Sequence, residues 1–342
     1  MRSYVGADLD TRAVTLAVVS EQGALLREKR LAPDPQEVLR FLAPWRPDLS
    51  LAVEASPFTY PFLDPLQEAG IEVHLAHPLM LKAIAYAKVK TDRVDALTLA
   101  QILRLGMLPE SYIYPKELRP LRDLARRRAR LVEARSLGYR WVQTLYRQRG
   151  IAPPDRNRVK HPADGAAGLF PAEEDRRYLA GLDTITAAHS QAIENIEDLL
   201  HEKCLLDERY RLLMGVPGIG KTYAQLVMLE VGDISRFPSH RRFISYARLT
   251  PGLYQSGKTS RRGRNPHQGN RHLKVAFRQA ALFAVRHDPH VRAFFDRLIE
   301  SRPRIVAYAI VARRLAVGVF YVLTRRVPFH SGRLFARVSP VV

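Results

Sequence analysis

Cysteine is nearly absent from the sequence. The single cysteine, Cys204, cannot form a disulfide within the chain, and one thiolate is too few for a cysteine-based zinc site. Cys204 lies in a segment with helical periodicity. We therefore expect an unreactive thiol there, without a redox or metal-binding function.

Long uninterrupted hydrophobic runs are also lacking. Asp8 and Asp10 interrupt the first apolar run, so the pattern excludes a signal peptide at that place. Arg313 and Arg314 divide the apolar stretch 305–323 into two pieces that are each too short to span a bilayer. We expect this stretch to be a core helix with one basic face. The expected protein has no membrane partner and is cytoplasmic.

Acidic residues are missing from one long part of the chain. No Asp or Glu occurs between Asp233 and Asp288, whereas Arg and Lys recur throughout that segment. Over the whole sequence, 54 Lys and Arg against 34 Asp and Glu give a formal net charge of +20. This charge predicts a polyanionic partner and strongly salt-dependent binding. Nucleic acid is the leading candidate, and an acidic membrane surface competes with it.

The first third of the chain alternates short apolar runs with polar turns. Its 342 residues and 46% apolar content allow two or three units with real cores. Three strands, a helix, and then alternating strands and helices are the order of an RNase H-like mixed sheet. The expected elements are strands over 3–8, 13–19 and 25–31, a helix over 36–44, a buried strand over 50–54, a helix over 60–69, a strand from Ile71, and a helix from Asp92 capped by Thr91.

Four carboxylates in this region stand at the ends of predicted elements. Asp8 ends the first strand, Glu54 ends the fourth, and Asp92 and Asp95 lie on one face of the helix that they open. Brought together, they would repel one another unless a divalent ion neutralised them, and such oxygen-rich sites suit Mg²⁺ or Mn²⁺. The helix dipole alone also favours Asp in a first turn, and Asp10 could replace Asp8. Both alternatives stay open.

The middle of the chain is predicted to be helical and basic. The density and single sign of charge over 116–149 favour a nucleic-acid-facing helix over a merely solvated one. Prolines in 151–172 indicate a mobile connection, and the periodicity of 173–213 is typical of a coiled-coil arm for self-association. The arginines of the basic helix expected at nucleic acid are Arg126, Arg127 and Arg128.

One segment, Gly215–Thr222, satisfies the spacing of a phosphate loop. A phosphate loop must follow a buried strand, whereas the preceding residues DERYRLLM are charged and helical in spacing. The pattern predicts a helix-hairpin-helix instead, although some hairpins of this form serve only in packing. Its turn can present backbone N–H groups to a DNA phosphate. The residues expected there are Gly218, Gly220 and Lys221.

A short basic stretch from Tyr254 to Arg264 contains Ser256 beside Gly257. A serine in such a place can bind phosphate through its hydroxyl or attack phosphate as a nucleophile. Ser256 has the least hindered access of the hydroxyls nearby. The rival hydroxyls are Tyr254, Thr259, Ser260 and Ser245. The cations expected to hold a nucleic-acid backbone here are Lys258, Arg261, Arg262, Arg264 and Arg271.

Several segments resemble the DEDD transposases of the insertion-sequence-110 family. They are YVGADLDTRAVTLAVV, LAVEASPFTYPFLDPLQEAG and KVKTDRVDALTLAQ, followed later by PGIG, LTPGLYQSG, and GR with GNRHLK. The resemblance implies a RuvC-like domain with acids at Asp8, Glu54, Asp92 and Asp95, and a serine nucleophile at Ser256. It also implies the domain bounds. The RuvC-like domain and its basic helix cover 1–150, a linker and coiled-coil arm cover 151–205, and a helical transposase domain covers 206–342.

The same resemblance implies an activity and its partners. Donor and target DNA would be cut and rejoined through a phosphoserine intermediate with Mg²⁺, guided by a structured RNA, in a homodimer or homotetramer. Two alternatives remain. One is a RuvC-like nuclease or junction resolvase without a covalent intermediate, and the other is a non-enzymatic architectural DNA-binding protein.

Overall fold

The computed structural model describes residues 2–84, 91–153, 166–250, 252–256, 259–263 and 268–336. The chain divides into two compact units, Met1–Lys116 and Glu117–Val342. Each unit has its own hydrophobic core. The units are described in turn.

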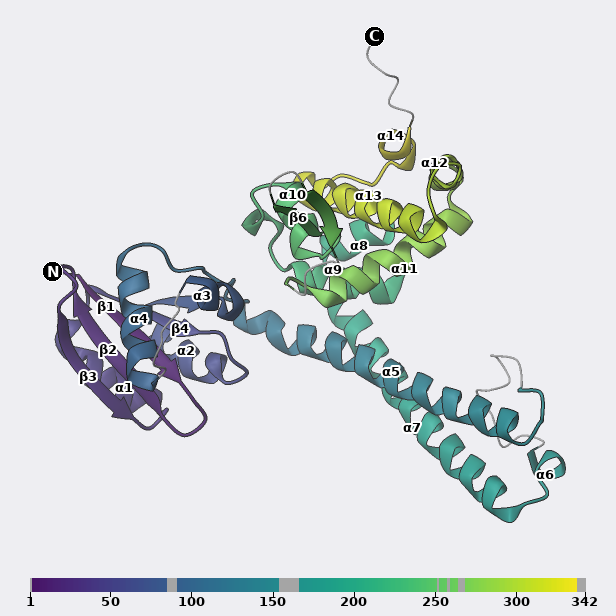
Figure 1. Ribbon diagram of the computed structural model, residues 1–342, viewed down its shortest axis with the longest axis horizontal. Helices are drawn as coiled ribbons and strands as arrows, with labels where there is room; N and C mark the ends of the chain where they lie inside the picture. The colour runs from purple at the N-terminus through teal and green to yellow at the C-terminus, as the bar shows by residue number, and fades with distance from the viewer. Residues whose placement is uncertain are drawn as a thin grey trace, which may run out of the picture. The chain divides into compact units, whose positions relative to one another are not determined.

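The first unit contains a five-stranded mixed sheet (Figure 1). Its order is β3-β2-β1-β4-β5, with antiparallel pairs β1–β2 and β2–β3 and parallel pairs β1–β4 and β4–β5. This order and these directions define an RNase H-like sheet and confirm the predicted fold class. The strands are β1 (Ser3–Leu9), β2 (Val14–Ser20), β3 (Leu25–Leu31), β4 (Leu49–Glu54) and β5 (Glu72–Ala76).

Helices cover both faces of this sheet. Strand side chains alternate between faces, so Leu51 and Val53 of β4 pack with α1 and α2, whereas Ala52 between them packs with α3 and α4. Every residue of β2 is buried, whereas β3 at the sheet edge is charged and mostly exposed. The helices are α1 (Pro35–Leu42), α2 (Thr59–Glu68), α3 (Pro78–Ile84) and α4 (Asp92–Arg104).

The second unit is mostly helical and also contains a two-stranded hairpin. Its helices are α5 (Arg119–Gln148), α6 (Ala166–Leu169), α7 (Glu173–Cys204), α8 (Glu208–Met214), α9 (Lys221–Val231), α10 (His240–Tyr246), α11 (Arg271–His287), α12 (Pro289–Ile299), α13 (Arg304–Arg325) and α14 (Ser331–Phe335), and its strands are β6 (Gly252–Ser256) and β7 (Thr259–Gly263). The confirmed class is therefore an α/β unit followed by a mostly helical one.

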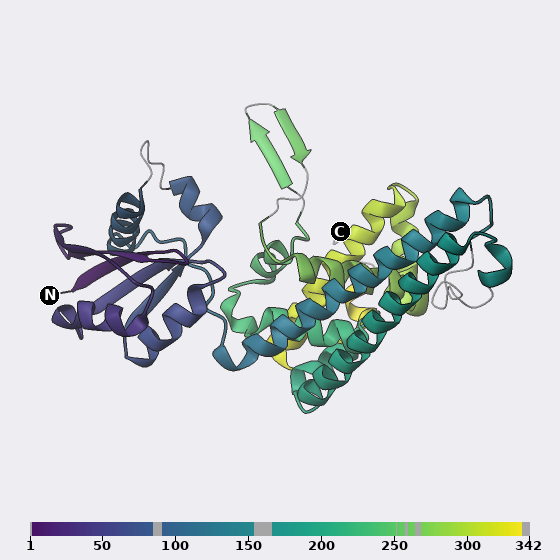
Figure 2. The same ribbon diagram turned by 90° about the horizontal axis from the view of Figure 1, so that it is seen from below.

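Two long helices, α5 and α7, lie side by side (Figures 1 and 2). Gly138 permits their close approach, because a Cβ there would lie 2.6 Å from Cγ2 of Thr186. A small core near Tyr146 and an ion pair of Arg149 with Asp175 join their far ends. The sequence-based division assigned the basic helix to a first domain ending at residue 150. In the structure α5 instead packs against α7 and α9 within the second unit.

Part of the predicted connection 151–172 lies outside the described residues, which resume at 166. Within the described part, Phe170 is fully buried and meets Tyr146 edge-on, with ring centroids 4.9 Å apart. This end of the connection is therefore anchored on the core between α5 and α7.

The longest apolar helix, α13, is a core helix as predicted. One face, including Val311, Leu315 and Val319, is fully buried in the core of the second unit. Arg314 on another face donates through Nε to the carbonyl of Leu334 at 2.6 Å. In the described part of the chain, this is the one helix long and apolar enough to cross a membrane.

The lone thiol agrees with its predicted character. Cys204 is free and fully buried at the end of α7. Burial raises the pKa of its thiol to about 11, so the thiolate is scarce at neutral pH.

Candidate functional site

Two of the predicted acids lie at one end of the mixed sheet. Asp8 is the last residue but one of β1, and Glu54 is the last residue of the neighbouring strand β4. The pair that precedes them, Ala7 with Val53, is in parallel register. Neighbouring parallel strands finish at the same end of a sheet, so the two half-buried carboxylates start from adjacent backbone positions.

Helix α4 carries the other two acids in its first turn. Thr91 caps the helix by accepting a hydrogen bond from the N–H of Val94 at 3.3 Å, as the sequence predicted. The helix crosses β1 closely because the strand has a glycine there. A Cβ on Gly6 would lie 1.9 Å from the carbonyl oxygen of Ala96, so that contact is possible only with glycine.

The first turn of α4 lies at the same end of the sheet as Asp8. Asp92 and Arg30 of β3 form an ion pair at 3.9 Å. Arg30 is registered with Thr15 of β2, and Thr15 is registered with Asp8 of β1. The backbone positions of all four predicted acids therefore lie at the same end of the sheet. We call this end the acidic edge of the first unit.

Among the described residues, no group of three or more His, Cys, Asp or Glu side chains is arranged to hold a metal ion. The Asp92 side chain is 63% exposed and can turn without repacking a core. The four positions and their oxygen donors fit a divalent cation, provided that the side chains turn toward one another. Asp10, the open alternative, is exposed and accepts from the N–H of Thr11 in its turn.

In the second unit, residues 215–220 join two helices, as predicted for a helix-hairpin-helix. Helix α8 precedes the turn, so the strand that a phosphate loop requires is not there. Helix α9 begins at Lys221 without a side-chain cap. Backbone N–H groups at such a helix start favour an anion.

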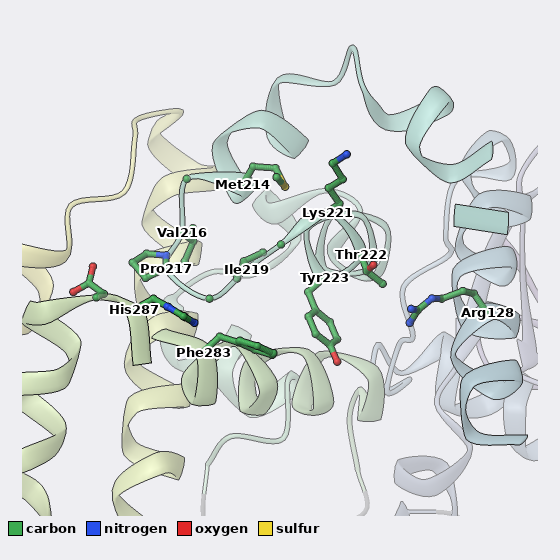
Figure 3. Close-up of a pocket in the computed structure, with 14 residues that line it drawn as sticks. Arg128, Met214, Val216, Pro217, Ile219, Lys221, Thr222, Tyr223, Phe283 and His287 are labelled. Atoms are coloured by element: carbon green, nitrogen blue, oxygen red, sulfur yellow. The ribbon is translucent and has the colours of Figure 1, made fainter. Parts of the chain in front are cut away.

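Gly218 fixes how this turn sits on α11. Its φ is +78°, and a Cβ there would lie 2.0 Å from the carbonyl oxygen of Ala280. The turn lines a pocket of about 640 Å³, in which Phe283 and His287 form the side provided by α11 (Figure 3). Lys221 is exposed and points away from those two side chains. Gly218 is thus committed to packing, whereas Lys221 is free to meet a ligand.

Ser256 is the last residue of β6 and is paired with Thr259, the first residue of β7. In the structure this serine lies in a two-stranded hairpin, which extends away from the helices of the second unit (Figure 2). Arg261 is registered with Tyr254, and Arg262 is the next residue of β7. Gly257, Lys258 and Arg264 lie outside the described residues.

The chain segments that lead into and out of this hairpin are fastened to each other. The N–H of Asn270 donates to the carbonyl of Tyr246 at 2.6 Å, and Nε of Arg248 donates to the carbonyl of Gly269 at 2.8 Å. Gly269 has a φ of +98°, and a Cβ there would lie 2.5 Å from the Tyr246 oxygen. These contacts hold together the two segments between which the hairpin with Ser256 is inserted. We call the two hydrogen-bonded segments the base of the hairpin.

A buried carboxylate, Glu230 of α9, lies beneath this base. Its side chain is 1% exposed and accepts two hydrogen bonds from Arg126 of α5, at 2.6 and 2.8 Å. Asn270 donates to it at 2.6 Å while capping α11 through the N–H groups of His272 and Leu273. Burial alone would raise the pKa of Glu230, but these donors lower it below its ordinary value.

Sequence reasoning missed this network. Its signal was an acid, Glu230, in the otherwise apolar segment TYAQLVMLEVG. A carboxylate in such a helix is costly to bury without partners, so a partner could have been expected. Which cation supplies it could not, because Arg126 is 104 residues away along the chain.

The predicted nucleic-acid arginines of α5 have different environments. Arg126 binds Glu230, and Arg128 binds Glu197 of α7, so both are engaged within the protein. Arg127 between them is exposed. Arg271 pairs with Glu133 at 3.4 Å, but both side chains are largely exposed, and such pairs open easily. Arg127 and Arg271 are thus the ones accessible to a partner.

The first unit is RNase H-like and has acids at one end of its sheet. The second unit is helical and has a helix-hairpin-helix and a basic hairpin that carries a serine. Together these features define a class of nucleic-acid-processing proteins. Two family models match the chain. The DEDD transposase model of the IS110 type, described as "Transposase", matches residues 5–145, and "Transposase IS116/IS110/IS902 family" matches residues 210–296. The chain belongs to the IS110 family of transposases.

Individual relatives agree with this family. The chain is 31% identical over 161 residues to the "uncharacterized 43.6 kDa protein" of insertion element IS110 from Streptomyces coelicolor, covering 46% of this chain and 38% of that protein. It is 25% identical over 273 residues to the transposase for insertion sequence element IS1111A of Coxiella burnetii, covering 77% and 74%. The match thus spans well under half of the IS110 protein's length.

Among the solved structures that are similar to this chain is one of RuvC. It is T. thermophilus RuvC in complex with Holliday junction substrate, with 20% identity and a TM-score of 0.26, covering 32% of this chain and 100% of that chain. The strand order and directions, rather than this likeness, identify the fold of the first unit.

Proposed function

We propose that this chain cuts and rejoins the DNA of an insertion sequence, with Ser256 as the nucleophile. The observation that carries the proposal is that both family matches fall on chemically suitable sites. The first match contains the four acids at one sheet edge, and the second contains the hairpin with Ser256. Acids at an RNase H-like edge and a hydroxyl among cations are both suited to phosphodiester chemistry.

The proposed step exchanges one ester of phosphorus for another. The Ser256 oxygen forms a bond to phosphorus as the bond to one deoxyribose oxygen breaks, and that oxygen leaves with the electron pair and takes up a proton. The proton of the serine hydroxyl passes to solvent. A hydroxyl of a second DNA strand reverses the exchange, so rejoining needs no nucleotide hydrolysis.

The residues around the two sites have distinct tasks in this proposal. A divalent metal ion, Mg²⁺ or Mn²⁺, would be held by Asp8, Glu54, Asp92 and Asp95, and when bound it supplies charge that offsets the negative charge developing on phosphate. Arg261 and Arg262 would hold the DNA backbone beside Ser256, as would Lys258 and Arg264, which lie outside the described residues.

Further partners belong to the same proposal. The net charge of +20 supports binding to nucleic acid in general, here donor and target DNA. A structured guide RNA is proposed from the family resemblance alone. Because the acids and Ser256 lie on different compact units, we propose that a homodimer or homotetramer completes each site. The helix pair α5–α7 would supply the contact between protomers. The expected location is the cytoplasm, at the nucleoid.

The test is to trap the covalent intermediate. The full chain is incubated with DNA that contains the ends of its own element, the cognate RNA and Mg²⁺, then denatured. DNA attached to protein is sought on a gel, and the attached residue is mapped by peptide mass spectrometry. We expect the attachment on Ser256. Ser256→Ala should abolish it, whereas Ser260→Ala, on the facing strand, should retain it.

Three other outcomes count against the proposal. DNA cut without attached protein indicates a RuvC-like nuclease, in which water attacks. Binding without cutting, unchanged by Glu54→Gln, indicates an architectural protein. Attachment that persists in Ser256→Ala assigns the chemistry to another hydroxyl, and mapping would then distinguish Tyr254 from Thr259.

A further inference from the structure

A second pocket lies in the helical unit, apart from the helix-hairpin-helix. It has a volume of about 680 Å³ and is formed by residues 248–249, one face of α11 and the start of α13. Four cations line it, and among the described lining residues there is no Asp or Glu. The cations are Arg248, Lys274, Arg278 and Arg304. We name it the basic pocket.

Three cations of the basic pocket, Lys274, Arg278 and Arg304, form no ion pair with a carboxylate in the described part of the chain. Lys274 and Arg278 lie one turn apart on α11, and neither forms an ion pair with a described carboxylate. Arg304 opens α13, a helix of 22 residues that begins without a side-chain cap, so its N-terminal dipole adds positive potential at the same place. Three cations and a helix start in one concavity predict an anionic ligand with more than one charge.

The pocket also has an apolar part, which a simple anion site does not need. Val275 is 49% exposed and Ile305 is 71% exposed, and both line the basic pocket. Exposed aliphatic side chains beside cations suit a ligand that alternates charged and apolar parts. A nucleic-acid strand has this character, with phosphates at regular spacing and the faces of sugars and bases between them.

Size and position decide which nucleic acid fits. The volume is that of a pocket for a small molecule, so a few nucleotides of one strand fit within it and a duplex does not. Arg248 and Leu249 belong both to the pocket and to the segment that leads into the β6–β7 hairpin. We propose that the basic pocket holds a short single-stranded DNA segment next to the phosphate that Ser256 attacks. The inference rests on the proposed function.

The experiment measures the salt dependence of binding. The full chain is titrated with a fluorescent 12-nucleotide single-stranded DNA at several salt concentrations, and a triple variant, Lys274→Gln with Arg278→Gln and Arg304→Gln, is compared with the parent. Each lost phosphate contact lowers the slope of log K against log salt by about 0.7, so we expect a decrease of about 2. That difference corresponds to roughly 100-fold weaker binding at 0.1 M salt, with equal affinities near 1 M.

A matched variant controls for the loss of net charge. Arg211, Arg325 and Arg333 are exposed cations of the same unit outside the basic pocket. Their triple change to Gln removes the same charge and should lower the slope by less than half as much. Ile305→Ser should weaken binding several-fold and leave the slope unchanged, because it removes an apolar contact and no charge. Unfolding temperatures establish that each variant is folded.

Several results would overturn the assignment. Equal slopes for the pocket and control variants would show that the pocket cations act only through the net charge of the protein. A loss of affinity seen only with RNA or duplex DNA would refute single-stranded DNA as the ligand. The covalent assay separates this inference from the proposed function. If the parent forms the attachment and the pocket variant binds normally, only the pocket fails. If the slope falls as expected but no attachment forms, the pocket stands as a DNA site and the serine chemistry fails.

Discussion

Substitution of Glu230 tests how much its buried ion pair with Arg126 stabilises the second unit. Glu230→Gln removes a charge that is 1% exposed and leaves Arg126, at 34% exposure, without its counter-ion. Breaking a buried ion pair costs roughly 3–5 kcal/mol, and the partial exposure of Arg126 places the expected loss near the lower limit, at about 3 kcal/mol. For a unit of this size, that loss corresponds to a fall of roughly 10 °C in unfolding temperature.

The control is an ion pair of the same helix α5 that lies at the surface. Glu133 meets Arg271 at 3.4 Å, with both side chains more than 60% exposed. Glu133→Gln makes the same chemical change and should cost less than about 1 kcal/mol. The two variants therefore separate burial of the pair from the loss of one negative charge.

The assay is thermal unfolding of the full chain, followed by circular dichroism and calorimetry, because the two units need not unfold together. A double-mutant cycle with Arg126→Met should give a coupling energy of about 2 kcal/mol between Arg126 and Glu230. If Glu230→Gln and Glu133→Gln cost the same, or if the coupling is near zero, the network does not hold the base of the hairpin.

Three further predictions concern backbone contacts and protonation. Gly6→Ala forces α4 away from β1 and should destabilise the first unit by about 3 kcal/mol in denaturant titration, whereas Gly181→Ala, whose Cβ meets no atom within 4 Å, should be neutral or slightly stabilising. Gly218→Ala combines a positive φ with a backbone clash and should cost the second unit about 3 kcal/mol by the same method, while Gly220→Ala, also open within 4 Å, should cost less than about 1 kcal/mol. Burial lowers the pKa of His272 below its ordinary 6.5, so the unfolded chain binds more protons and stability falls as the pH drops below 6.5. His272→Gln should reduce this loss, measured as the difference in unfolding temperature between about pH 7.5 and 5.5; an unchanged difference would contradict the assignment.

The mixed sheet could be predicted because its signals are local. Apolar runs of strand length, the turn before Leu25 and the capping Thr91 each act within a few residues, and all three agree with the structure. The placement of Asp8, Glu54 and the start of α4 at one edge then follows from strand order. What local signals do not determine is the direction of each carboxylate, since a side chain at an element end can turn to several partners.

The serine segment shows the opposite limit. Ser256 was singled out by the charge around it, but its place at the end of a strand was not expected. The segment from Gly252 to Gly263 has glycines at both ends and little apolar alternation, so its pattern gives no strand signal. The pairing of β6 with β7 depends on both segments, and no single residue specifies their register.

The arginines of α5 show why charge counts overstate a binding surface. Arg126, Arg127 and Arg128 are consecutive, so successive side chains point about 100° apart around the helix. One therefore reaches Glu230 of α9, one is exposed to solvent, and one reaches Glu197 of α7. Of these three consecutive arginines, Arg127 alone is exposed. Each carboxylate that binds an arginine internally offsets its charge locally, so the potential that a nucleic acid meets depends on the cations without such partners.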